Sequence, residues 1–114
     1  TDTMSDKVYT KTYNETYGVK AYYRETPPTQ EDLERFTIMA EAVLSFNSYD
    51  SLSKINAPTL VIGVEKDEMV TGEASEEIAE KLSCSLIMYK GYKHAVYDEA
   101  PDYKEILLKF LLEK

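Results

Sequence analysis

The chain has 114 residues, and its 13 Lys and Arg residues against 21 Asp and Glu residues give a formal net charge of −8. A chain of this length forms one domain with a modest core, since it buries roughly 65% of its unfolded surface. The negative charge repels phosphate backbones and anionic membrane surfaces, which excludes nucleic acid as an expected partner.

The sequence shows no signal for a membrane span or for export. No apolar run approaches the roughly 20 residues that cross a bilayer, and the polar start lacks the basic and apolar regions of a signal peptide. One cysteine, Cys84, excludes an internal disulfide, and with one histidine, His94, it cannot complete a structural zinc site. We therefore expect a cytoplasmic chain without a cofactor or a bound metal. Because the first residue is Thr1 rather than Met, we also expect a cleaved product, an engineered piece or a fragment.

Tyrosines mark the first 26 residues, among Thr, Lys, Asn and Glu. Their spacing fits a helical stripe, whereas the Thr and Asn residues disfavour a helix and the alternation fits a strand equally well, so both remain open. The segment is interpreted as a partly buried surface segment, or as a lid or pocket wall. The tyrosines are Tyr9, Tyr13, Tyr17, Tyr22 and Tyr23.

A helix is predicted from Gln30 to about Phe46. Two prolines precede it, and Thr29 with Asp32 forms a capping-box pattern. Its apolar residues recur at spacings of three and four, which predicts a face that packs on the core or covers an active-site mouth. These residues are Leu33, Phe36, Met39, Ala40, Val43 and Leu44.

After a polar connector at residues 47–56, the chain predicts a strand, a helix, a strand and a helix. Residues 59–64 are too apolar for a half-exposed strand and fit a parallel strand covered on both faces. Residues 73–82 form the crossover helix, residues 86–89 the second strand, and Pro101 begins the last helix. The fold class is therefore α/β, with two parallel strands and flanking helices.

The first strand has a neighbour on one edge only. Such an apolar parallel strand belongs in the interior of a wider sheet. We expect the open edge to pair with the Tyr-rich segment, with a second chain or with a missing part of this one.

Two chemically useful side chains follow the two strands. Asp67 lies in the loop after the first strand and His94 in the loop after the second, so both are expected at the same end of the sheet. A carboxylate beside an imidazole fixes the tautomer of the ring and stabilises its protonated form, as a nucleophilic triad requires. Glu65 and Glu68 are alternatives for the carboxylate, or loop charges.

Acidic residues also stand just ahead of Pro101. Asp98 and Glu99 are interpreted as acids near the positive end of the last helix.

Two stretches resemble the C-terminal part of an α/β-hydrolase. Residues 50–70 read DSLSKINAPTLVIGVEKDEMV, and residues 89–101 contain YKGYKH followed by DEAP. In that family a strand of the type PTLVI-G-x-x-D supplies the triad acid, and a G-x-x-H loop supplies the triad histidine. The resemblance covers residues 50–114 and implies that Asp67 is the acid and His94 the base.

The resemblance also implies how the chain is organised. It makes the two strands the last two of an eight-stranded sheet, in a partial α/β-hydrolase fold. Residues 1–48 become the end of a mostly helical cap or lid segment, and residues 49–114 the C-terminal β-α-β-α unit of the core.

The nucleophile of this family is missing from the sequence. The family carries it on a G-x-S-x-G elbow ahead of the cap. The nearest stretch, GEASE at residues 72–76, lacks the second Gly and lies in a predicted helix. Cys84 is a possible nucleophile in principle, but it is expected at the end of the sheet opposite His94 and is interpreted as a small buried or semi-buried thiol.

We therefore expect the C-terminal part of a serine hydrolase that acts on a small ester or other acyl substrate, inactive by itself. The alternative is a non-catalytic α/β interaction module or homodimer that pairs through the open strand edge. A third, weaker alternative is a calcium or magnesium site at Glu65, Asp67 and Glu68.

Overall fold

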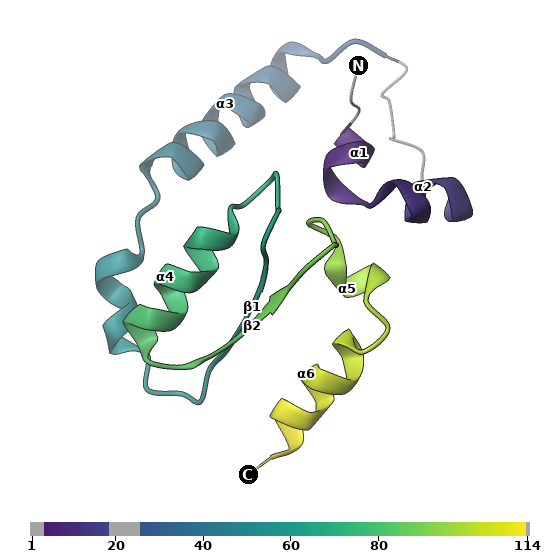
Figure 1. The fold of residues 1–114 in the computed structure, drawn as a ribbon. Coiled ribbons are helices and arrows are strands. Elements are labelled where there is room, and N and C mark those ends of the chain that lie inside the picture. Colours follow the sequence, from purple (N-terminus) through teal and green to yellow (C-terminus); the bar gives the residue numbers. More distant parts are fainter. Residues whose placement is uncertain (1–3, 19–25, 114) are drawn as a thin grey trace.

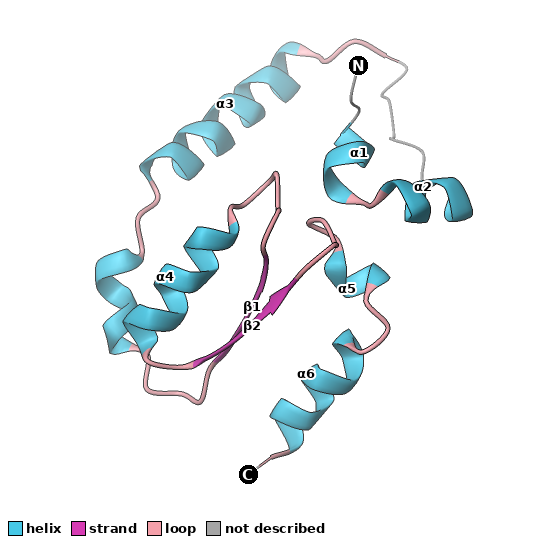
Figure 2. Ribbon diagram, in the orientation of Figure 1, coloured by secondary structure: helices cyan, strands magenta, loops and turns pink. Residues whose placement is uncertain are grey.

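The computed structural model describes residues 4–18 and 26–113, and Figure 1 shows how their elements are arranged. Two central strands lie among helices (Figure 2). In chain order the elements are α1 (Met4–Val8), α2 (Lys11–Tyr17), α3 (Gln30–Ser45), the 3₁₀ helix η1 (Tyr49–Lys54), β1 (Leu60–Val64), α4 (Gly72–Leu82), β2 (Ser85–Tyr89), α5 (Val96–Glu99) and α6 (Tyr103–Leu112).

The two strands pair in parallel, as the sequence predicts. Leu60 lies opposite Ser85 at one end of the ladder, and Val64 lies opposite Tyr89 at the other. The crossover helix α4 connects them, and the described part of the chain places no strand on the other edge of β1. The described residues of the Tyr-rich segment form two short helices and no strand, so they do not pair with that edge.

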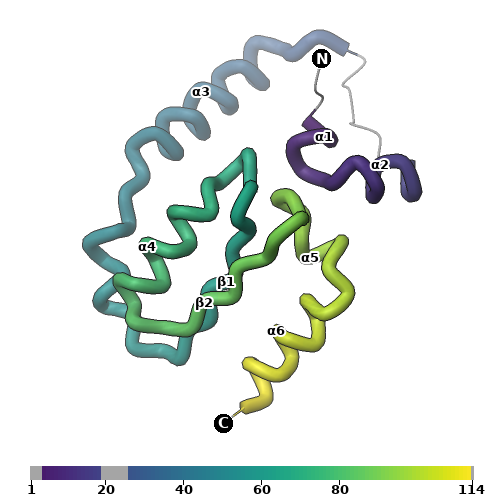
Figure 3. The backbone as a smooth tube through the Cα atoms, viewed as in Figure 1, coloured from purple at the N-terminus to yellow at the C-terminus, as the bar shows by residue number. Residues whose placement is uncertain are grey.

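Side chains alternate between the two faces of this small sheet. Val64 and Tyr89 form a buried core with Val96 and Ala100, and Ile106 of α6 packs against it. The residues between them along each strand, such as Gly63 of β1, face α4. The two helices accordingly lie on opposite sides of the strands (Figure 3).

Two glycines let α4 approach β1 closely. A Cβ atom at Gly63 would lie 2.6 Å from Cβ of Ser75, and one at Gly72 would lie 2.7 Å from the carbonyl oxygen of Val64. Both distances are too short for real Cβ contacts, so the absence of a side chain at these positions sets the distance between helix and strand.

Tyr89 connects the core to the start of α6. Its hydroxyl donates a hydrogen bond of 3.0 Å to Asp102. Burial, together with this hydrogen bond, raises the pKa of Tyr89 to about 12. The last helix begins at Tyr103, two residues later than the prediction at Pro101, and the short helix α5 occupies part of the predicted loop.

Asp98 and Glu99 do not serve the last helix, so that interpretation is wrong. Asp98 accepts a hydrogen bond from the hydroxyl of Tyr9 at 3.0 Å, and Glu99 accepts one from the backbone N–H of Thr10 at 2.8 Å. Both residues belong to α5, and their carboxylates bond to the N-terminal segment instead.

Of the two alternatives for the N-terminal segment, the structure shows the helical stripe in its described residues. The rings of Tyr9 and Tyr13 are stacked with a centroid distance of 5.0 Å, and those of Tyr13 and Tyr17 are tilted by 39° at 4.5 Å. A spacing of four residues places them on one side of α2 and its N-terminal approach. Tyr22 and Tyr23 lie outside the described residues.

Helix α3 has the predicted start, but it does not pack on a core. The hydroxyl of Thr29 accepts from Asp32 N–H, and the Asp32 carboxylate accepts from Thr29 N–H, which completes the capping box. No residue of α3 is buried, and Phe36 and Leu44 are 71% and 86% exposed. The prediction of a core-facing helix is therefore wrong for the described residues, because no other element covers its apolar face.

The whole molecule is more open than a closed domain of its length. Its Cα radius of gyration is 17.3 Å, against about 13 Å for a compact domain of this size. Its accessible surface is 9441 Å², against about 6,400 Å² for a compact monomer of this mass. None of the helices in residues 4–18 and 26–113 has the length and apolar character to cross a bilayer.

Candidate active site

Asp67 and His94 lie side by side, as the order of the strands predicts. Asp67 follows β1 by three residues and His94 follows β2 by five, and both loops leave the same end of the sheet. Nδ1 of His94 lies 2.8 Å from Oδ2 of Asp67. The structure thus brings the two predicted residues together, while their catalytic role stays a prediction.

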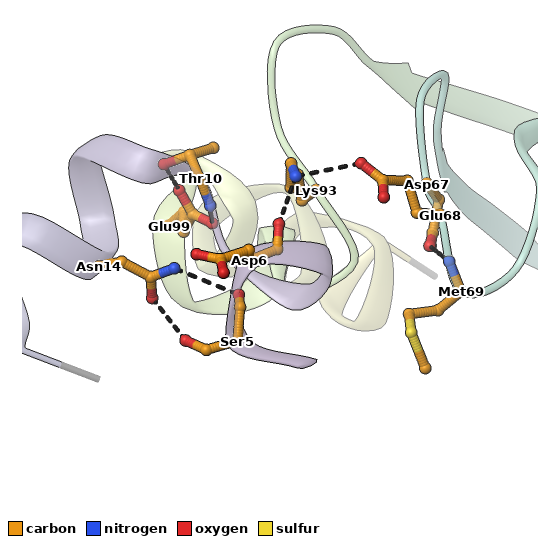
Figure 4. Close-up of polar contacts among 9 residues, drawn as sticks. All are labelled: Ser5, Asp6, Thr10, Asn14, Asp67, Glu68, Met69, Lys93 and Glu99. Atoms are coloured by element: carbon orange, nitrogen blue, oxygen red, sulfur yellow. Dashed lines mark hydrogen bonds and ion pairs between the residues drawn. The ribbon is translucent and has the colours of Figure 1, made fainter. Parts of the chain in front are cut away.

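The loop after β1 fixes the carboxylate through its other oxygen. Oδ1 of Asp67 accepts hydrogen bonds from the backbone N–H groups of Met69 at 2.7 Å and Val70 at 3.0 Å, an Asx turn. Figure 4 shows the carboxylate of Asp67 turned back toward Met69. Because Oδ1 is engaged in this way, Oδ2 is the oxygen available to the imidazole.

This environment favours the charged form of Asp67. Its side chain is 10% exposed, and burial taken alone would raise its pKa. The hydrogen bonds from His94, Val70 and Met69 outweigh burial and hold the pKa of the carboxyl below its ordinary value. A charged carboxylate accepts hydrogen bonds only, so Nδ1 of His94 carries a proton here.

The contact with Asp67 leaves the second ring nitrogen of His94, Nε2, without that partner. With Nδ1–H donated to Asp67, the lone pair on Nε2 is left to take a proton. The side chain is 37% exposed, so solvent and other groups reach the ring. Gly91, at φ 80°, turns the chain out of β2 into the loop that carries it.

A cavity of about 300 Å³ adjoins the pair. Its lining includes Asp67, His94, three successive residues of β1, Ser75 of α4 and Tyr103 of α6. Since these residues come from β1 and from helices on both faces of the sheet, the cavity lies along the free edge of β1. A larger cavity of about 610 Å³ lies between α2 and the start of the His94 loop, but neither Asp67 nor His94 lines it.

The alternative carboxylates are turned to other partners. Glu65 lies 3.8 Å from the ammonium of Lys90, and Glu68 lies 3.1 Å from that of Lys93. Neither is paired with the imidazole. No group of three His, Cys, Asp or Glu side chains suited to a metal ion occurs within the described ranges.

Cys84 and the GEASE stretch lie where the sequence predicts. Cys84 is half-buried and immediately precedes β2, at the end of the strands opposite His94. Ser75, in the GEASE stretch, lies inside α4 and packs against Gly63, although it also lines the smaller cavity.

The sequence did not reveal the contacts that hold the His94 loop. They come from the N-terminal segment, and the contact between Lys93 and Asp6 spans 87 positions of the chain. An isolated Thr or Lys gives no signal for such a contact, since both are ordinary surface residues.

The fold and the pair together define an α/β arrangement with a carboxylate and an imidazole at the ends of parallel strands, the class to which many hydrolases belong. A protein named "Putative carbamate hydrolase RutD", from Stutzerimonas stutzeri (strain A1501), is 32% identical to this chain over 91 residues. The aligned region is 77% of this chain and 32% of RutD, so the chain spans about a third of the length of this relative. No model of a known protein family and no solved structure gives a significant match. The chain thus has a distant relative among hydrolases.

Proposed function

We propose that this chain is the C-terminal part of a serine α/β-hydrolase and supplies the acid and the base of its triad. The observation that carries the proposal is the 2.8 Å contact between Asp67 and His94 at the ends of two parallel strands. Similarity to RutD supports a hydrolase origin independently of this geometry.

In the proposed mechanism, the nucleophile is a serine outside this chain. Nε2 of His94 takes the proton of the serine hydroxyl while the oxygen attacks the carbonyl carbon of the substrate. Asp67 stabilises the resulting imidazolium through Nδ1–H. The same proton passes from Nε2 to the leaving group as the bond to it breaks, and water then repeats the two steps on the acyl-enzyme.

The proposed substrate is a small ester or related acyl compound. Because RutD is named as a putative carbamate hydrolase, we add carbamates as candidate substrates. The carbonyl carbon of a carbamate bears one nitrogen and one single-bonded oxygen, and a nucleophile attacks it in the same way. The cap segment proposed at residues 1–48 would contribute to the choice among them.

The open edge of β1 is where the rest of the sheet would pair. In the described part of the chain, β1 is an apolar parallel strand with one open edge, and α3 has an exposed apolar face; additional protein would cover both. A chain without its nucleophile should not complete the cycle, so we propose that these 114 residues are inactive alone.

Two measurements test this proposal. The purified 114-residue chain should hydrolyse p-nitrophenyl acetate no faster than buffer, and His94→Ala should change nothing. Clear turnover that His94→Ala abolishes would show that the chain holds its own nucleophile, against the proposal.

The second measurement uses the reading frame upstream of Thr1. We expect it to encode a strand followed by G-x-S-x-G. The longer protein should react with a fluorophosphonate at that serine, and His94→Ala should suppress the labelling. Labelling that is unchanged in His94→Ala would argue against His94 as the base.

A second candidate is a non-catalytic module that binds a second copy of itself. The exposed apolar residues of α3 and the free edge of β1 favour it. Size-exclusion chromatography tests this second candidate. A stable monomer at all concentrations would exclude a module that binds a second copy of itself.

A further inference from the structure

Both neighbours of His94 in the sequence are bound to helix α1. The backbone N–H of Ala95 donates to the carbonyl oxygen of Val8 at 2.9 Å. The ammonium of Lys93 donates to the carbonyl oxygen of Asp6 and, at 3.1 Å, to the carboxylate of Glu68 (Figure 4). Lys93 therefore joins α1 to the loop that carries Asp67.

These contacts are made at the C-terminal end of the short helix α1. The last carbonyl groups of a helix have no partner within it, and they attract N–H donors and positive charge. Lys93 and Ala95 supply one of each. The residues on either side of the imidazole are thus anchored to the same helix end.

A second set of contacts holds α5, the short helix that directly follows the loop. Glu99 accepts from both the backbone N–H and the hydroxyl of Thr10, at 2.8 and 2.5 Å (Figure 4). The hydroxyl of Thr10 also accepts from the backbone N–H of Tyr13 and so caps α2. The hydroxyl of Tyr9 donates to Asp98, and that hydrogen bond, with burial, raises the pKa of Tyr9 to about 12.

We infer that residues 6–10 position the imidazole of His94, and that Thr10, Lys93 and Glu99 are positioning residues for it. They touch neither a substrate nor the reacting atoms. They hold the loop and the helix α5 that follows it, so that Nδ1 points at Asp67. The inference rests on the proposed function for its chemical meaning. The contact between His94 and Asp67 can nevertheless be measured in the chain without any catalytic activity.

The test uses the single histidine of the chain. In tag-free, isotope-labelled protein, long-range proton–nitrogen correlation spectra report the ratio of the Nδ1–H and Nε2–H forms of His94 directly. We expect Thr10→Val to shift this ratio toward Nε2–H by about fivefold, which corresponds to the loss of one hydrogen bond. Thr10→Ser, which keeps the hydroxyl, should restore the original ratio.

A matched control is Thr16→Val. The hydroxyl of Thr16 bonds within α2 to the carbonyl of Thr12 and does not reach the His94 loop. This variant should leave the ratio unchanged. The backbone amides of β1 and β2 report in the same samples whether the sheet is intact.

Lys93→Met provides the second variant, in case Thr10→Val disturbs the sheet. It keeps the aliphatic stem of Lys93 and removes the contacts to Asp6 and Glu68, and it should shift the ratio in the same direction. If the sheet stays intact and the ratio stays at its original value in both variants, while Asp67→Asn changes it, the inference is wrong. Failure of the upstream serine to react would instead contradict the proposed function and leave this result untouched.

Discussion

Asp67 divides its two carboxylate oxygens between two tasks. Oδ1 accepts from the N–H groups of Met69 and Val70, and Oδ2 faces the imidazole of His94. The division matters because the two backbone donors require an acceptor at one position. A side chain that replaces Asp67 therefore needs an acceptor oxygen for the N–H groups of Met69 and Val70.

Asp67→Asn should reverse the tautomer of His94. The amide oxygen will stay with the two backbone N–H groups, which turns its NH₂ group toward Nδ1 and forces Nδ1 to accept a hydrogen bond. We expect Nε2–H to become the dominant form, in the correlation spectra described above. A ring that keeps Nδ1–H in this variant would show that Asp67 does not set the tautomer.

The same carboxylate should make stability depend on pH. Because the pKa of Asp67 is lower in the folded chain than in the unfolded one, the unfolded chain binds more protons, and stability falls as the pH drops below about 4. Asp67→Asn should cost about 1 to 2 kcal/mol at pH 6 and less at pH 3.

Urea unfolding of the parent and of Asp67→Asn, over this pH range, measures the difference. Glu76→Gln, on the exposed face of α4, changes the net charge by the same amount and serves as the control. A gap between the parent and Asp67→Asn that is equally large at pH 3 and pH 6 would contradict the assignment.

At the scale of elements, the contact between β1 and α4 depends on the absence of a side chain at Gly63. The strand ends at the loop that carries Asp67, and Gly72 brings the start of α4 against that strand end. A displacement of α4 would therefore reach the candidate site through its supporting strand.

Gly63→Ala should destabilise the chain by about 1 to 3 kcal/mol, because the new methyl group overlaps Ser75. A Gly at position 75 removes the overlapping Cβ, so Gly63→Ala should cost less in a Ser75→Gly background. The double-mutant cycle, measured by urea unfolding, cancels the separate cost of a Gly within the helix. Equal costs in both backgrounds would mean that Ser75 is not the obstacle.

At this scale, the elements that the sequence predicts correctly are those that local chemistry decides. The capping box at Thr29, the parallel strands and the crossover helix all follow from turn signals and hydrophobic periodicity. The prediction failed for the packing of α3, because an amphipathic pattern states that one face is apolar but does not state what covers that face.

At the scale of the whole molecule, stability should be distributed unevenly. The core lies between the sheet and the C-terminal helices, whereas no residue of α3 is buried. A helix of this length is marginal in water without tertiary packing.

Hydrogen exchange should show this contrast directly. We expect the amides of α3 to exchange within the first time point, and those amides of β1 that bond to β2 to be the most protected. Repeating the measurement at several protein concentrations gives the control for self-association. Protection of α3 that equals that of β1 and rises with concentration would favour the homodimer over the fragment.

The sequence by itself determined the α/β order, the parallel pairing, and the meeting of Asp67 and His94. It did so because strand and helix periods are local, and because parallel strands direct their following loops to one end of a sheet. The tertiary structure alone decided that Lys93 and Glu99 are bound by residues 6–10. Such contacts depend on how distant segments pack. A single polar side chain does not indicate, from the sequence alone, which distant residue it will contact.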